Sequence, residues 1–304
     1  MDKDVKKISI IIPSRGRPQK LLEMMNSALN FASAPKLIEF VLYIDDDDKS
    51  NYEMFEHKAI IIKGKRTNMG VMNNLCIHQA SGKVIILCND DVIVRTKKWD
   101  DIIYENAKLY DDVFLLYPND LNKGKKQCSF PILSKELFLK YPELLPDKYK
   151  GSFIDLHIMD IFIQLKELGI NKINYLENLK FEHLHHSIGK SEHDETYAQR
   201  MRFSDDDLFI SYADLRFKLS NKIANDINKN PSFSTNTNTN TNTNTNTNTQ
   251  VDMASMNIFQ FIKNNTLMFF YSNASFYYRS KLWIYMFSRR TYNIFIYSFK
   301  IRSQ

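Results

Sequence analysis

The sequence contains little cysteine, and this scarcity argues against two classes of small domain. Its 304 residues include three cysteines, Cys76, Cys88 and Cys128, which form neither a CxxC pair nor an even set. A disulfide scaffold and a zinc module are therefore not expected, and the low count fits a reducing compartment.

Long apolar runs are missing as well. No stretch reaches the roughly 18 uncharged apolar residues that a membrane span requires. The charged N-terminus leads into an apolar run at 8–12, which is too short for the core of a secretory signal. We therefore expect a cytoplasmic protein, with peripheral attachment to a membrane as the alternative.

The charge is modest and unevenly placed. The chain has 41 basic and 35 acidic residues, a net charge of +6, and with 43% hydrophobic residues it is not globally disordered. Residues 251–304 contain seven basic residues and one acid, so the whole excess lies there and 1–250 is neutral. A nucleic-acid partner for the whole protein is therefore not favoured.

A strict alternation of Thr and Asn at 235–249 divides the chain. It contains no apolar residue, so we predict a disordered low-complexity linker at 231–250, after a single catalytic domain at 1–230. The tail at 251–304 carries 15 aromatic residues with basic ones interleaved and shows no evident helix cap. For this tail we favour a poorly ordered extension over contact with an anionic membrane surface and over nucleic-acid contact.

Strand and helix patterns alternate through the first hundred residues. Continuous apolar strands separated by helices predict an α/β fold with a parallel sheet covered on both faces. In such sheets, ligands bind beyond the carboxyl ends of the strands. Strands are predicted at 8–12, 40–44, 59–62 and 84–88, and helices at 18–31 and 69–80.

Acidic residues follow two of these strands. Asp90 and Asp91, after Asn89, repel each other unless a cation neutralises them, and hard oxygen ligands suit Mg²⁺ or Mn²⁺. A solvated turn is the alternative interpretation. Four acids at 45–48 follow the strand predicted at 40–44. We expect Asp45 to face the crevice beyond the strand ends and to bind a base or ribose. We expect the other three acids to be exposed turn residues or helix caps.

The first strand ends in two arginines, Arg15 and Arg17. Their guanidinium groups are suited to a phosphate or to stacking on a base. Ordinary surface charge is the competing interpretation.

Residues 8–120 resemble the nucleotide-binding half of a GT-A-type glycosyltransferase close to family 2. The segments that carry the resemblance are 10–18 (IIIPSRGRP), 43–47 (YIDDD), Asn74 with 80–83 (ASGK), and 87–92 (LCNDDV). The resemblance implies a GT-A-type, mixed but mostly parallel, Rossmann-like sheet in one catalytic domain. It also implies a UDP- or GDP-type sugar donor, a Mn or Mg divalent cation, and a glycan, lipid or protein acceptor.

The resemblance further implies which residues bind the nucleotide sugar. The chain departs from a strict DxD metal motif, because Asn89 takes the first position if Asp91 takes the second. The other register pairs Cys88 with Asp90. The nucleotide-sugar-binding residues that it implies are Asn74, in the helix predicted at 69–80, and a group at the strand ends: Pro13, Ser14, Arg15, Arg17, Asp45, Asn89 and Asp90.

The catalytic base is expected near a helix at 158–169 that ends in glycine. The apolar residues of this helix share one face, which puts Asp160 on the opposite face with Gln164 and Glu167 and favours a solvated role. Asp155 lies at the helix start, beside the crevice, with a simple N-cap as its alternative role.

Family 2-like enzymes place an acidic general base on such a helix. Counting back from the glycine puts Asp160 in one of the family's acidic positions and His157 in another, so resemblance and periodicity disagree. We favour Asp155 over Asp160 and keep both as catalytic candidates.

A histidine-rich stretch, 181–190, follows a predicted last strand. If it is extended, His183 and His185 point to one side, where imidazole can complete a Mn²⁺ site with Asp91. The resemblance supports a late histidine ligand, and Lys190 is placed to neutralise the leaving diphosphate. A surface histidine cluster is the alternative.

The sequence therefore predicts a metal-dependent, inverting glycosyltransferase, with inversion inferred from the resemblance alone. One alternative is an inactive nucleotide- or carbohydrate-binding module on the same fold, which the departure at Asn89 would support. The other is a sugar-phosphate nucleotidyltransferase, but such enzymes need a glycine-rich, lysine-containing loop, and 14–18 has one glycine and no lysine.

Overall fold

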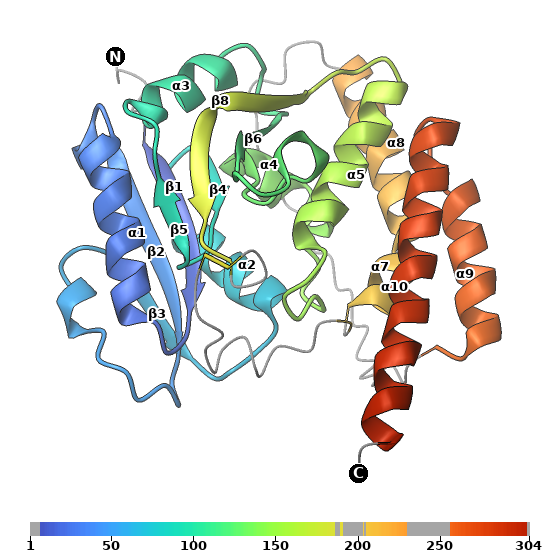
Figure 1. The fold of residues 1–304 in the computed structure, drawn as a ribbon. Helices are drawn as coiled ribbons and strands as arrows, with labels where there is room; N and C mark the ends of the chain where they lie inside the picture. The colour runs from blue at the N-terminus through green and yellow to red at the C-terminus, as the bar shows by residue number, and fades with distance from the viewer. Residues whose placement is uncertain (1–6, 186–188, 191–202, 204, 230–255, 303–304) are drawn as a thin grey trace, which may run out of the picture.

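The structure is a computed structural model, and it describes residues 7–185, 189–190, 203, 205–229 and 256–302. The predicted linker at 231–250 lies outside the described residues. Figure 1 shows a twisted central sheet with helices against both faces and a group of long helices beside one end.

The sheet has eight strands in the order β3-β2-β1-β4-β7-β6-β8-β5. Its first four strands in sequence are parallel, as predicted, because they are apolar runs joined by crossover helices. The GT-A-type α/β fold class is confirmed. The four parallel strands and the helices that connect them are β1 (Ile8–Ser14), α1 (Pro18–Phe31), β2 (Ile38–Asp45), β3 (Ile60–Gly64), α2 (Met69–Gln79) and β4 (Val84–Leu87).

The later strands make the sheet mixed. β7 (Ile132–Ser134) is antiparallel to both β4 and β6 (Leu115–Asn119), so β6 runs in the same direction as β1 and β4. β8 (Ile173–His183) is parallel to β6, and the short β5 (Val92–Val94) is antiparallel to β8. The carboxyl ends of β1, β2, β4, β6 and β8 therefore share one edge of the sheet.

Seven further α-helices follow in the described part of the chain. Along the chain, α3 follows β5, α4 follows β7 and α5 precedes β8. The helices α7 to α10 come after β8 (Figure 1). Their bounds are α3 (Trp99–Ala107), α4 (Lys135–Lys140), α5 (Ile154–Glu167), α7 (Asp206–Ser211), α8 (Ala213–Lys229), α9 (Ile258–Phe270) and α10 (Phe276–Arg302).

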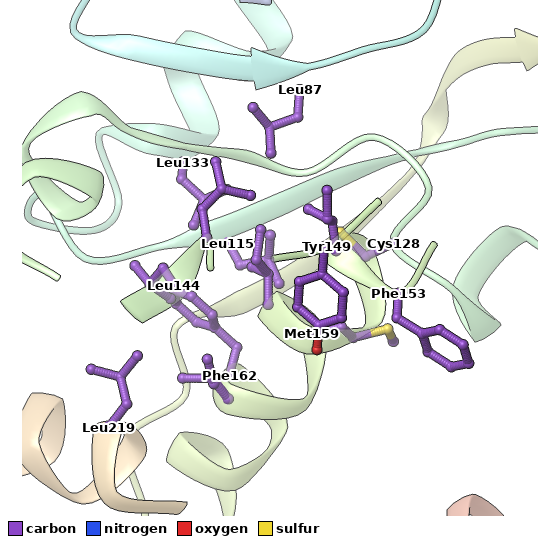
Figure 2. Close-up of a cluster of buried hydrophobic side chains, with 14 of the residues drawn as sticks. Leu87, Leu115, Cys128, Leu133, Leu144, Tyr149, Phe153, Met159, Phe162 and Leu219 are labelled. Carbon is purple, nitrogen blue, oxygen red and sulfur yellow. The ribbon is translucent and has the colours of Figure 1, made fainter. Parts of the chain in front are cut away.

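The sheet separates two apolar cores. Ile10 and Ile12 of β1 belong to the core that also contains Trp99, whereas Ile11 belongs to the opposite core, because successive side chains of a strand face opposite sides. Trp99 is fully buried in this core, and its indole nitrogen donates to the Ala28 carbonyl at 2.8 Å. Figure 2 shows the second core, where side chains of β4, β6 and β7 meet α5 and α8.

The C-terminal segment corrects our expectation of a poorly ordered tail. Residues 258–270 and 276–302 form helices, and the cap that we did not find is Asn257, which forms a reciprocal capping box with Gln260. Phe261, Met268 and Met286 are buried. In Figure 1, α9 and α10 lie beside α7 and α8 at one end of the molecule. Among the described residues, no helix combines the length and apolar character needed to cross a bilayer.

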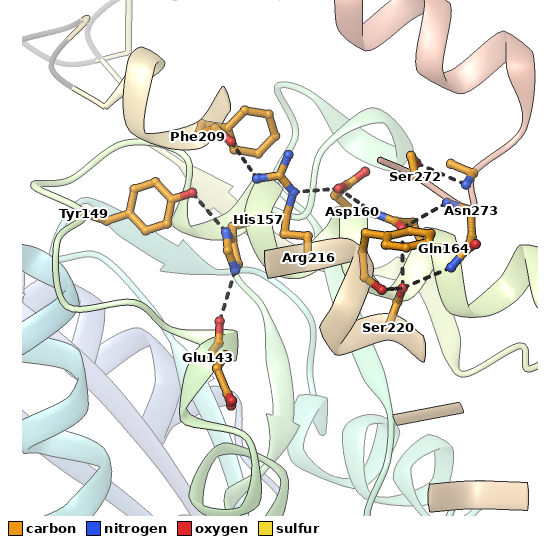
Figure 3. Close-up of polar contacts among 12 residues, drawn as sticks. Glu143, Tyr149, His157, Asp160, Gln164, Phe209, Arg216, Ser220, Ser272 and Asn273 are labelled. Carbon is orange, nitrogen blue, oxygen red and sulfur yellow. Dashed lines mark hydrogen bonds and ion pairs between the residues drawn. The ribbon is translucent and has the colours of Figure 1, made fainter. Parts of the chain in front are cut away.

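The predicted exposure of Asp160 is wrong. α8 covers the face of α5 that carries it, so Asp160 is 2% exposed and its Oδ2 lies 2.6 Å from Nε of Arg216, itself 1% exposed (Figure 3). Gln164, expected on the solvent side, is buried too and donates to the same oxygen at 3.0 Å. Helical periodicity identified one apolar face, but it did not indicate that a second helix would cover the other.

We expect Arg216→Met to lower the free energy of unfolding by about 3–5 kcal/mol, because it leaves the buried Asp160 carboxylate without its cation. Urea unfolding measures this change. Lys218→Met on the same helix is the matched control: Lys218 pairs with Asp214 in solvent, and such pairs contribute less than about 1 kcal/mol. Equal losses for the two variants would contradict the assignment of this buried pair.

Candidate active site

Polar side chains from several strands meet at the shared carboxyl edge of the sheet. Ser14 ends β1, Asp45 ends β2, and the segment after β4 supplies Asp90 and Asp91. β8 brings His183 to the same edge, because it runs parallel to β6. The parallel arrangement thus gathers residues that are far apart in the sequence.

Asp90 is held by groups from the end of β1. The Ser14 hydroxyl donates to Oδ2 of Asp90 at 2.8 Å, and Nη1 of Arg17 lies 3.2 Å from Oδ1. Burial, together with the nearby Asp91, raises the pKa of Asp90 to about 6 in spite of Arg17 and Ser14. Arg17 was predicted to bind a phosphate, but its side chain is only 8% exposed and pairs with these two acids. Its Nη1 also lies 3.9 Å from Oδ2 of Asp91.

Asp91 faces His183. Oδ1 of Asp91 lies 3.3 Å from Nε2 of His183, and both atoms are buried. Backbone pairing fixes this approach, because Val92 is opposite His183 in the β5–β8 ladder and the Leu184 amide donates to the Asp91 carbonyl at 2.8 Å. The ring of His185 meets that of His183 edge-on at 5.2 Å. Of the three residues predicted as metal ligands, the structure thus places Asp91 against His183, and His183 against His185.

The end of β2 presents a buried carboxylate. Oδ2 of Asp45 accepts from Arg15 at 2.9 Å, while Oδ1 is buried and makes no hydrogen bond within the described part of the chain. Burial raises the pKa of Asp45 against the opposing effect of Arg15. Arg15 also bonds Asp47, which is exposed as predicted.

The expectation for Asp48 needs correction, because this acid is half-buried and not an exposed turn residue. It accepts from the Gly16 amide at 2.7 Å and from the Ser50 amide at 3.0 Å. It therefore ties the loop after β2 to the loop after β1.

Two predicted binding residues make other contacts. Asn74 donates to the Leu145 carbonyl at 2.9 Å and to Asp147 at 2.6 Å, tying α2 to a later loop. Lys190 donates to Glu182 at 2.7 Å. Pro13 and Asn89 are half-buried beside the other strand-end residues. The nucleotide-binding roles of all four stay predictions.

Asp155 lies in the first turn of α5, and Phe153 occupies the N-cap position that we considered for it. It is half-buried, and its Oδ2 accepts from Nε2 of Gln127 at 2.6 Å. Asp155 thus keeps a neutral partner at the accessible end of the helix, whereas Asp160 is enclosed by α8.

Sequence reasoning missed Asp120. This buried acid follows β6, where its Oδ1 accepts from the amides of Asn122, Lys123 and Gly124 at 3.0, 2.7 and 2.8 Å, and its carbonyl accepts from the His183 amide at 3.1 Å. The signal was present, because the apolar run of β6 is followed by Asn-Asp, as β4 is.

Residues 9–147 match the family model of glycosyl transferase family 2. The chain carries a family 2 glycosyltransferase domain. It is therefore an enzyme of the class that transfers a sugar from a nucleotide-sugar donor. The matched segment includes Ser14, Asp45, Asp90 and Asp91, but it ends before Asp155 and His183.

Solved structures of glycosyltransferases share the fold. S. aureus TarS 1–349 in complex with UDP-GlcNAc has a TM-score of 0.51 and 17% identity, over 75% of this chain and 73% of that one. Another TarS 1–349 structure has a TM-score of 0.45 and 13% identity, over 73% and 83%. The mannosyltransferase PcManGT from Pyrobaculum calidifontis, in complex with GDP-Man and Mn²⁺, has a TM-score of 0.46 and 9% identity, over 71% and 64%. No curated protein matches the sequence.

Proposed function

We propose that this glycosyltransferase is metal-dependent and inverting, and that it uses a UDP- or GDP-linked donor at the carboxyl edge of the sheet. The observation that carries the proposal is the approach of Asp91 to His183, 3.3 Å apart and buried, from two segments that the sheet joins. A glycan, lipid or protein supplies the acceptor hydroxyl.

The residues at this edge fit a divalent cation. Nε2 of His183 is buried and makes no hydrogen bond within the described residues. Its 3.3 Å distance from Asp91 is close to the separation of two neighbouring ligands around a small cation, about 3 Å for bonds of about 2.1 Å. Across the described residues, no group of three or more His, Cys, Asp or Glu side chains is placed to hold a metal ion by itself. Mg²⁺ and Mn²⁺ sites commonly share their ligands with water and substrate phosphates.

Asp91 and His183 would hold this cation, with His185 beside them. When bound, the cation would stabilise the negative charge that develops on the leaving diphosphate. Arg17 neutralises part of the charge of Asp90 and Asp91, so the acid pair is stable before a donor arrives.

Asp45 is suited to recognise the nucleoside. Its buried Oδ1 has no hydrogen-bond donor within the described chain, and a buried acceptor without a donor is costly. An N–H of a base or a ribose hydroxyl would satisfy it. Arg15 orients the carboxylate through its other oxygen.

Asp155 is the better of the two candidate bases. Asp160 is buried under α8, and the Arg216 guanidinium lies 2.6 Å from its Oδ2, so an acceptor hydroxyl has no open approach to this carboxylate. Asp155 accepts from the neutral amide of Gln127 and is half-buried at the start of α5, nearer solvent than Asp160. It would take the proton of the acceptor hydroxyl while that oxygen attacks the anomeric carbon from the side opposite the diphosphate, and this geometry inverts the configuration.

Calorimetric titration with UDP and with GDP, each with and without Mn²⁺, tests the proposal. We expect one of the two nucleotides to bind, and to bind at least about tenfold more tightly with Mn²⁺, because Asp91 and His183 would hold a cation that also attracts the diphosphate. Release of nucleoside diphosphate from UDP-GlcNAc, UDP-glucose and GDP-mannose, with water as acceptor, then reports catalysis. Binding without such release favours an inactive binding module, and no binding at millimolar nucleotide refutes the proposal.

A further inference from the structure

We infer that Arg289 of α10 is a positioning residue for the acceptor side of this site. It holds in place the segment 150–155, which carries Asp155, so the C-terminal helices act as part of the catalytic domain. The inference rests on the proposed role of Asp155, and it extends that role to a residue more than a hundred positions later in the chain.

The first of three contacts that connect Arg289 to the segment 150–155 is an ion pair between α10 and α7. Nη2 of Arg289 lies 2.7 Å from Oδ1 of Asp206, and Nε lies 2.9 Å from Oδ2. The two side chains are 17% and 8% exposed. A two-pronged pair of this kind fixes the plane of the guanidinium as well as its position.

The second contact joins α10 to the start of α5. The guanidinium carbon of Arg289 lies 5.0 Å from the centre of the Phe153 ring, whose stacked neighbour Phe209 lies at 4.8 Å. Phe153 has a φ of 65°, a left-handed conformation that a bulky residue adopts only when its surroundings hold it there. The Phe153 carbonyl accepts from the His157 amide at 2.7 Å, so this residue sets the first turn of α5.

The third contact comes from the residue next to Asp206. Asp205 is 1% exposed, and it accepts from the amides of Lys150, Gly151 and Ser152 at 3.1, 3.0 and 2.7 Å. The start of α7 therefore holds both the loop before α5 and the arginine that covers Phe153. Loss of Arg289 would uncover Phe153 and would leave Asp206, the residue next to Asp205, without its cation.

The neighbouring arginine provides a natural comparison. Arg290 also pairs with an acid of α7, Asp207, and it bonds the Met256 carbonyl and lies over Phe261. Its side chain is 16% exposed, against 17% for Arg289. Arg290 thus fastens the C-terminal helices to α7 in a similar environment, through contacts that lie within those elements.

The test compares Arg289→Met with Arg290→Met in the full chain. We expect Arg289→Met to lower kcat for donor hydrolysis by roughly tenfold to a hundredfold, because small displacements of a catalytic group have effects of this size. The Kd for UDP or GDP should stay within about twofold, because the strand-end residues are unchanged. Amide exchange over 150–157 should become faster. Arg290→Met should leave kcat within about threefold of the parent and exchange over 150–157 unchanged.

Arg289→Lys guards against a variant that fails to fold. It keeps the positive charge but not the two-pronged geometry. We therefore expect its kcat to lie between that of the parent and that of Arg289→Met. Equal effects of Arg289→Met and Arg290→Met on kcat and on exchange, or unchanged exchange over 150–157 in Arg289→Met, would overturn the inference. Asp155→Asn, measured in parallel, separates the two proposals: if it keeps full activity, the base is misassigned, while the exchange data still decide whether Arg289 holds the segment.

Discussion

Asp91→Asn is expected to lower metal-stimulated donor hydrolysis by roughly 10²–10³-fold. The change keeps the size of the side chain but removes the carboxylate charge that faces His183 at 3.3 Å. A catalytic metal contributes several kcal/mol of charge stabilisation in the transition state, and about 1.4 kcal/mol corresponds to tenfold in rate. Steady-state release of UDP or GDP across a Mn²⁺ titration measures the effect.

The control for this variant is Asp111→Asn, because Asp111 is an exposed acid shortly before β6, at the end of that strand away from the site. It should keep its rate within about twofold, as expected for a surface substitution away from the site. Chelation of divalent ions with EDTA should lower the parent to about the rate of Asp91→Asn, and added Mn²⁺ should restore the parent. Full activity of the parent in EDTA, or of Asp91→Asn in Mn²⁺, would refute the metal role.

Asp155→Asn should lower donor hydrolysis by roughly 10²–10⁴-fold, the usual contribution of a general base. An amide of the same shape keeps the contact with Gln127 but cannot take a proton. Nucleotide binding should be unchanged, because Asp155 lies in α5 and outside the strand ends that we propose bind the donor. The loss should therefore appear in kcat, with the Kd for UDP or GDP within about twofold of the parent.

Glu167→Gln is the matched control for the base, because Glu167 is an exposed acid at the other end of α5. Its rate should stay close to that of the parent. If Asp155→Asn retains the parent's kcat while binding nucleotide normally, another residue deprotonates the acceptor. An inactive Asp155→Asn that also loses nucleotide binding would instead point to a structural role at the start of α5.

The strand ends show how far local sequence signals reach. Ile8–Ser14, Ile38–Asp45 and Val84–Leu87 were predicted to within a few residues, since continuous apolar runs followed by polar turns leave few alternatives in a chain of this composition. The same signals placed Asp45 and Asp91 at one edge, because parallel strands end on the same side. Asp120 follows the same pattern and was available to this reasoning.

The partners of these side chains were not available from local signals. Arg17 directly follows Gly16 in the loop after β1, and nothing in that loop indicates that its side chain turns inward to Asp90 rather than outward to a phosphate. Asp160 appeared solvated because periodicity describes one helix at a time, and α8 then covered it with Arg216. The tail appeared isolated because the acids that bind its arginines, Asp206 and Asp207, lie before the Thr-Asn tract.

The sequence by itself determined the class of fold, the acidic edge of the sheet and the family of the enzyme, because each follows from short segments that are read locally. Tertiary structure alone decided that His183 meets Asp91, that Asp155 rather than Asp160 keeps an accessible carboxylate, and that Arg289 reaches Phe153. Each of these contacts joins segments distant in the chain. Their positions depend on strand register and helix packing, which are fixed only when the whole domain buries its apolar surface.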